Sequence, residues 1–172
     1  HVGLILRIPR TEEQQEDDQR ILPFGPVFEK IEEAGTAVTQ AHNLAGYQAV
    51  GVRCREALLE LIGVAQDVAI WTDTPPQRAN FRAWTEIICN DLLPGDTNKE
   101  RRGALKGALE SAWTFSNLLT HSKSATWLDA DMAHSLTQHA SGMAISPIVR
   151  ELRGVPDQCP NCHSPRLEPE QA

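Results

Sequence analysis

The chain has 172 residues and a formal net charge of −7, and 41% of its residues are hydrophobic but only 5% aromatic. This length suits one domain of ordinary size with an aliphatic core. A chain this acidic is a poor general binder of nucleic acid, because affinity for phosphate comes mainly from lysine and arginine. The sequence has no apolar run of about 18 residues, so we expect no membrane-spanning helix.

The first 23 residues differ in composition from the rest of the chain. The apolar stretch Val2–Ile8 is stopped by Pro9, which indicates a short strand or an extended arm. The stretch Thr11–Arg20 contains five acidic residues and no apolar one, which is typical of a solvated loop or a frayed helix. We therefore predict an N-terminal arm or linker over residues 1–23.

From Val27 onward, apolar residues recur at spacings of three and four, which predicts amphipathic helices. The second of these helices is expected to run to about Trp71. The five predicted helices begin near Val27, Tyr47, Arg78, Thr97 and Thr126. Together they predict an all-α, antiparallel bundle of about five helices over residues 24–153.

Three sequence signals predict where the later helices begin and end. The patterns Thr97-x-x-Glu100 and Thr126-x-x-Asp129 have the form of capping boxes, so we expect each to start a helix. Pro147 is expected to kink or end the last helix, because proline lacks the N–H that a helix interior needs. A short helical continuation after this proline stays open.

Residues 154–172 are rich in proline and polar residues and form a predicted tail. Cys159 and Cys162 make a Cys-x-x-Cys motif, a spacing that suits zinc. The other zinc ligands have three possible sources. These are His134 or His139, the cysteines of a second tail in a dimer, and sequence before the first residue. A thiol pair that binds metal weakly or oxidises is the alternative. Four cysteines in this arrangement do not resemble a secreted disulfide framework, so we expect a cytoplasmic protein.

The chemically most informative stretch is Ser116–His121, in the fourth predicted helix. Asn117 and His121 are four residues apart and share one face of that helix. A histidine suits proton transfer because its ordinary pKa is about 6.5. A histidine at a helix end is also explained by its interaction with the last carbonyl groups. A nucleotide site and a purely structural role therefore both stay open.

Two segments resemble the HEPN superfamily of nucleotide-binding helical domains: Val52–Leu61, which carries Arg53 and Arg55, and Asn117–His121. The resemblance covers about residues 27–152. It implies metal-independent RNA cleavage, in which a 2′-hydroxyl attacks the adjacent phosphate, a histidine moves a proton and an arginine neutralises charge. By this resemblance His121 is the proton-transfer residue, and Asn117 orients it or the phosphate.

The arginine of the family motif is not matched in this chain, because Ser116 stands at its position. Looser spacings place Phe115 or Thr114 there. Losing such a cation removes a stabilisation that is often worth several kcal/mol in other enzymes. The site is therefore either inactive or uses another cation. A partner subunit could supply it, since the resemblance also implies a homodimer; within the chain the candidate phosphate-binding residues are Arg53, Arg55 and Lys123.

These features predict a nucleic-acid-linked domain of a bacterial stress or phage-defence protein, with RNA as its target. If the chain is an enzyme, we expect an endoribonuclease toxin that needs no metal for catalysis. The alternative is a non-catalytic module for dimerisation, interaction or nucleotide sensing. Arg53 and Arg55 also fit that alternative as arginines that flank the apolar position of Cys54 and keep their charged ends in water.

Overall fold

The computed structural model describes residues 22–152 and 154, and this part of the chain is helical without strands. The predicted all-α fold with five helices is confirmed. The predicted arm up to residue 21 and the cysteine tail from residue 155 lie outside the described residues. The elements are η1 (Leu22–Phe24), α2 (Gly25–Gln40), α3 (Leu44–Val68), α4 (Phe81–Leu92), η2 (Asp96–Asn98), α5 (Lys99–His121) and α6 (Trp127–Leu152).

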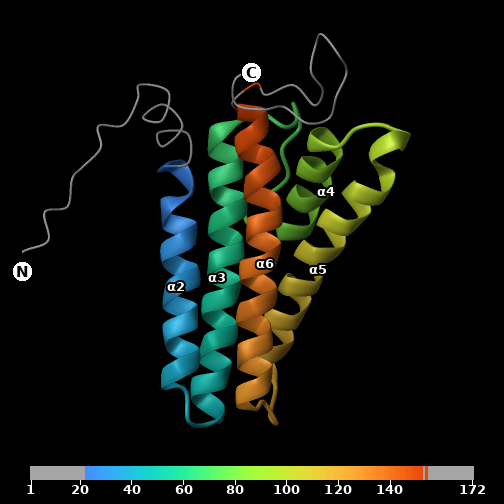
Figure 1. Ribbon diagram of the computed structural model, residues 1–172. Coiled ribbons are helices and arrows are strands. Elements are labelled where there is room, and N and C mark those ends of the chain that lie inside the picture. Colours follow the sequence, from blue (N-terminus) through green and yellow to red (C-terminus); the bar gives the residue numbers. More distant parts are fainter. Residues whose placement is uncertain (1–21, 153, 155–172) are drawn as a thin grey trace, which may run out of the picture.

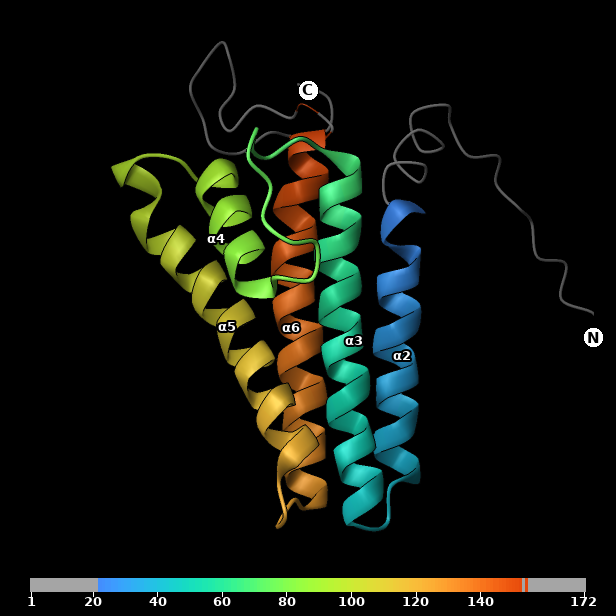
Figure 2. The same cartoon turned by 180° about the vertical axis from the view of Figure 1, so that it is seen from behind.

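The long helices α2, α3, α5 and α6 alternate in direction along one bundle axis (Figure 1). α2 and α5 lie on opposite sides of the α3–α6 pair. α5 tilts away from α6 at its N-terminal end, and the short helix α4 occupies the space that opens there (Figures 1 and 2). Within the described residues, none of these helices combines the length and the apolar character needed to cross a bilayer.

The core is divided into two apolar clusters by buried hydroxyl groups. Ser116 lies on α5 between Ala112 of the larger cluster and Leu119 of the smaller one, and Thr137 has the matching position on α6. The larger cluster contains the buried aromatic side chains, Phe24, Trp71, Phe81 and Trp84. The smaller cluster consists of Ala34, Val38, Ala41, Val50, Cys54, Leu119, Ala130 and Ala133.

α3 and α5 approach closely at Gly51, which has no side chain to separate them. A Cβ atom built at this position would lie 2.9 Å from the carbonyl oxygen of Ser116 and 2.9 Å from the backbone nitrogen of Thr120. Ordinary van der Waals contacts of a Cβ atom begin near 3.4 Å. The glycine therefore allows the two helix backbones to touch and fixes which face of α3 meets α5.

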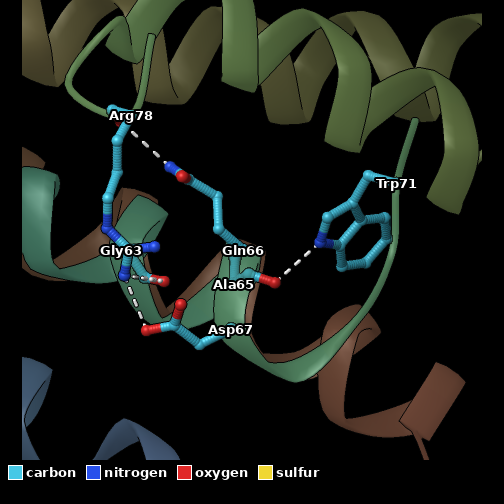
Figure 3. Close-up of polar contacts among 6 residues, drawn as sticks. All are labelled: Gly63, Ala65, Gln66, Asp67, Trp71 and Arg78. Atoms are coloured by element: carbon cyan, nitrogen blue, oxygen red, sulfur yellow. Dashed lines mark hydrogen bonds and ion pairs between the residues drawn. The ribbon is translucent and has the colours of Figure 1, made fainter. Parts of the chain in front are cut away.

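α3 ends at Val68, before Trp71, so the predicted end was three residues too late. The indole N–H of Trp71 turns back and donates to the carbonyl oxygen of Ala65 at 2.7 Å, which satisfies one of the last carbonyl groups of the helix (Figure 3). Arg78 donates to the carboxylate of Asp67 at 2.6 Å and lowers the pKa of that carboxyl. These contacts hold the connection over residues 69–80 against α3 (Figures 2 and 3).

One of the two predicted capping boxes forms. At the start of α6, the backbone N–H of Thr126 donates to the carboxylate of Asp129 at 2.7 Å, and the N–H of Asp129 donates back to the threonine hydroxyl at 3.4 Å. The prediction for Thr97 and Glu100 was wrong, because η2 forms first and α5 begins at Lys99 without a side-chain cap.

Pro147 lies inside α6 and does not end it, since the helix continues to Leu152. The proline removes one backbone donor, but Ile145, Ile148 and Val149 around it are buried in the larger cluster. Burial of this apolar face keeps the last turns of the helix in place, and the short continuation left open by the sequence is therefore present.

Candidate functional site

Asn117 and His121 lie in the last two turns of α5, on one helix as predicted. Asn117 is half-buried, and its amide N–H donates to the carbonyl oxygen of Trp113 at 2.7 Å. His121 is exposed at the last position of the helix, just before the N–H of Ser122 closes the turn on Leu119 at 3.3 Å. The imidazole of His121 is thus open to solvent, whereas the side-chain amide of Asn117 already donates one hydrogen bond within its own helix.

A pocket of about 380 Å³ lies where the N-terminus of α4 meets α5, and Asn117 lines it together with Arg82. Stacking of Phe81 on Trp113, with ring centroids 4.5 Å apart, positions this end of α4. Arg82 is exposed and brings a cation next to Asn117. No sequence signal marked Arg82, because its neighbourhood depends on how α4 packs against α5.

The three cations named from the sequence lie in different places. Arg53 points toward α2, with its guanidinium 3.6 Å from the carboxylate of Glu33. Arg55 lies one turn after Gly51, so it is on the face of α3 that meets α5, and its side chain is half-buried. Lys123 is exposed in the connection after α5. Arg55 therefore lies on the side of α3 toward α5, and Arg53 on the side toward α2; neither lines the pocket that contains Asn117.

Ser116, which stands at the arginine position of the HEPN motif, is fully buried. Its carbonyl oxygen faces Gly51 of α3, and its hydroxyl has no hydrogen-bond partner among the described residues. An arginine at this position would have to enter the core between α3 and α5. Ser116 and its buried position therefore offer no cation to a phosphate.

Within residues 22–152 and 154, no group of three or more His, Cys, Asp and Glu side chains is arranged to hold a metal ion. Cys54 and Cys89 are buried free thiols, and burial raises the pKa of Cys54 to about 11 and that of Cys89 to about 12. Such thiols stay protonated near neutral pH and are poor nucleophiles. Cys159 and Cys162, the predicted zinc ligands, lie outside the described residues.

A groove of about 620 Å³ runs between α2 and α6, on the opposite side of α6 from α5. Its apolar lining includes Phe28 and Ile31 of α2, and two glycines, Gly35 and Gly142, face it from the two helices. His134 narrows the groove at Gly35, since a Cβ atom there would lie 3.0 Å from its Nε2 atom. The imidazole thus fills the space that a side chain at Gly35 would take.

Large apolar side chains are exposed where α5 ends and α6 begins. Phe115 of α5 packs against the smaller core cluster, which includes Ala130 and Ala133 of α6, and Leu118 lies one turn further along α5. Leu128 and Met132 are four residues apart on α6, at the same end of the bundle. We call this surface the α5–α6 patch; its exposed fractions are 57% for Leu118, 51% for Trp127, 59% for Leu128 and 44% for Met132.

Comparisons of the chain with protein-family models, with curated proteins and with solved structures found no match. Over residues 22–152 and 154 the chain is a bundle of five α-helices with an α4–α5 pocket, an α2–α6 groove and exposed apolar side chains where α5 ends and α6 begins.

Proposed function

We propose that this chain is a non-catalytic interaction module that forms a homodimer through the α5–α6 patch. The exposure of four large apolar side chains at one end of the bundle carries this proposal. Exposed apolar surface that is grouped in this way marks interaction sites more often than isolated exposed residues do. Aromatic residues and methionine, both present here, are also enriched at protein interfaces.

The charges around the α5–α6 patch favour a second copy as the partner. Lys123 is exposed in the connection after α5, and Asp131 is partly exposed beside Met132 on α6. A twofold axis brings the same patch of both subunits together, so a residue that contacts another is contacted by it in return. The basic group of one subunit can therefore face the acidic group of the other across the axis.

The oligomeric state of the purified chain tests this proposal. We expect sedimentation equilibrium between about 1 and 100 µM to show a dimer, the range in which interfaces of modest size associate. Leu128→Glu should give a monomer, because it buries a charge in the patch. Ile70→Glu is the matched control, since Ile70 is 90% exposed outside the patch, and it should remain a dimer. A monomeric wild-type chain at every concentration would refute the proposal.

A second candidate function is RNA binding or cleavage in a bacterial defence protein or toxin, and the position of Arg82 favours it. Arg82 shares a pocket with Asn117, and the exposed His121 follows one turn later on α5. In this candidate His121 transfers the proton, Asn117 orients the phosphate, and Arg82 supplies the charge that the HEPN motif takes from its own arginine. Arg55 on the facing side of α3 is a second source of positive charge.

RNA cleavage in the presence of a chelator tests the second candidate. We expect His121→Ala to abolish cleavage, whereas His139→Ala, which changes an exposed histidine of α6, leaves it unchanged. Arg82→Ala should lower the rate by about a hundredfold, as loss of one charge-stabilising group does elsewhere, and Arg101→Ala serves as its control. Cleavage that survives His121→Ala, or no cleavage by the folded wild-type chain, would exclude this candidate.

A further inference from the structure

The α2–α6 groove has an open stretch at Gly142 and a stretch at Gly35 that His134 fills, and we call these its open end and its closed end. Gly35 and His134 meet at the closed end. Phe28 lies seven residues before Gly35 on α2, and Gly142 lies eight residues after His134 on α6. Each is therefore about 11 Å along its own helix from the closed end, and the two helices are antiparallel. Phe28 and Gly142 therefore face each other at one level, and the groove extends over about two helical turns.

The open end has room for a side chain from another molecule. A Cβ atom at Gly142 would meet no atom within 4 Å, whereas the one at Gly35 would touch His134. Phe28 is 45% exposed beside this space, although it is a large apolar side chain. Ile31 continues the apolar wall toward the closed end. An apolar side chain inserted next to Gly142 would cover the exposed ring of Phe28.

The rim of the groove is acidic. Glu32 lines the groove, and Glu29 lies beside it, three residues earlier on α2. Both are exposed, and within the described residues neither forms an ion pair. Glu33 is paired with Arg53, on the side of α2 that faces α3. Lys30, also on α2, is half-buried. Glu29, Glu32 and Glu33 line a second pocket on α2 together with one cation, Arg53. Three carboxylates and one guanidinium leave the surface beside the apolar groove with a net charge of −2.

We propose that the α2–α6 groove binds a basic amphipathic helix of a partner protein. Apolar residues of that helix at positions i, i+4 and i+7 span about two turns, which matches the length of the groove from Gly142 to His134. Lysine or arginine residues beside this apolar stripe face Glu29 and Glu32. None of the residues that define the α5–α6 patch lines the groove, so the groove and the dimer are separate proposals.

A synthetic peptide of leucine and lysine, about 18 residues long and with leucine at helical spacing, is the probe. Its fluorescence anisotropy should rise with the concentration of the full chain, and the affinity should fall with added salt. Gly142→Leu fills the open end and should weaken binding by at least about tenfold. Gly103→Leu is the matched control, because Gly103 is an open glycine of α5, and it should bind as the wild type does.

The charge of the rim is tested separately. Glu29→Gln combined with Glu32→Gln should weaken binding by about tenfold, and Glu100→Gln combined with Glu110→Gln on α5 should have little effect. A peptide with glutamate in place of lysine should not bind. Thermal unfolding of each variant checks that the bundle remains folded.

Three results would overturn the proposal: no binding of the leucine–lysine peptide by the folded chain, equal binding by wild type and Gly142→Leu, or equal binding of the glutamate peptide. Sedimentation provides a fourth result that would overturn the proposal. If Gly142→Leu converts a wild-type dimer into a monomer, the groove is an interface between two copies and not a site for a partner helix. If Leu128→Glu abolishes the dimer and peptide binding persists, the groove proposal holds independently of the dimer proposal.

Discussion

Replacing Gly51 by alanine tests whether the backbones of α3 and α5 touch as the structure describes. The new Cβ atom would lie 2.9 Å from two backbone atoms of α5, the carbonyl oxygen of Ser116 and the nitrogen of Thr120, and 3.0 Å from the hydroxyl oxygen of Thr120. Backbone atoms cannot rotate away as the end of a flexible side chain does. The two helices must therefore move apart by about half an ångström to reach an ordinary contact.

The expected cost follows from two opposing effects. Inserting a methyl group into packed surroundings costs about 1–3 kcal/mol, and contact with backbone puts Gly51→Ala in the upper part of that range. Replacing glycine by alanine within a helix stabilises by up to about 1 kcal/mol. We expect a net loss of about 1–2 kcal/mol in the free energy of unfolding, which lowers the melting temperature by about 2–8 °C in a chain of this size.

Urea and thermal unfolding measure this loss, with Gly107→Ala as the matched control. Gly107 lies within α5, and a Cβ atom there would meet nothing within 4 Å, so this variant should be as stable as the wild type or more stable. If Gly51→Ala gains as much stability as Gly107→Ala, the helices do not touch at this point and the reasoning is wrong.

Four further predictions concern buried groups. Ser116→Ala should raise the free energy of unfolding by about 1 kcal/mol, because it removes a buried hydroxyl that has no partner among the described residues, and exposed Ser111→Ala should raise it by less. Trp71→Phe should lower it by about 1–3 kcal/mol, since it leaves the carbonyl oxygen that the indole meets unpaired. Cys54 and Cys89 should resist alkylation at pH 8 until urea unfolds the chain, and peptide mass spectrometry measures this. Equal alkylation rates in the folded and the unfolded chain would contradict their burial. Because burial raises the pKa of both thiols from 9.0 to about 11 and about 12, the free energy of unfolding should fall as the pH rises above 9.

The helices could be predicted from the sequence because their signals are local. Apolar residues at spacings of three and four marked all five α-helices, and the Thr126–Asp129 box marked the start of α6. Two features of the helices depend on contacts that spacing does not encode. α3 stops early because Trp71 turns back to a carbonyl group of that helix, and α6 passes Pro147 because apolar side chains on both sides of the proline are buried.

The candidate site was only partly predictable for the same reason. The sequence placed Asn117 and His121 on one helix face, since four residues make about one turn. Which cation lies near them depends on how separate helices pack. The packing of α4 against α5 places Arg82 in the pocket of Asn117, whereas Arg53 lies on the side of α3 that faces Glu33 of α2. The burial of Ser116 likewise follows from the close approach at Gly51, which no pattern within α5 reveals.

The distribution of side-chain size along the bundle links the fold to the proposed dimer. The larger core cluster contains four buried aromatic side chains, whereas half of the smaller cluster consists of alanines. Because stabilisation grows with the apolar area that is buried, the end of the bundle with the smaller cluster contributes less to the stability of the monomer. The α5–α6 patch lies at this end, so a second copy that covers it would add apolar burial where the single chain has little. Association through the patch would therefore stabilise the weaker end of the bundle, and dimerisation and folding would be linked there.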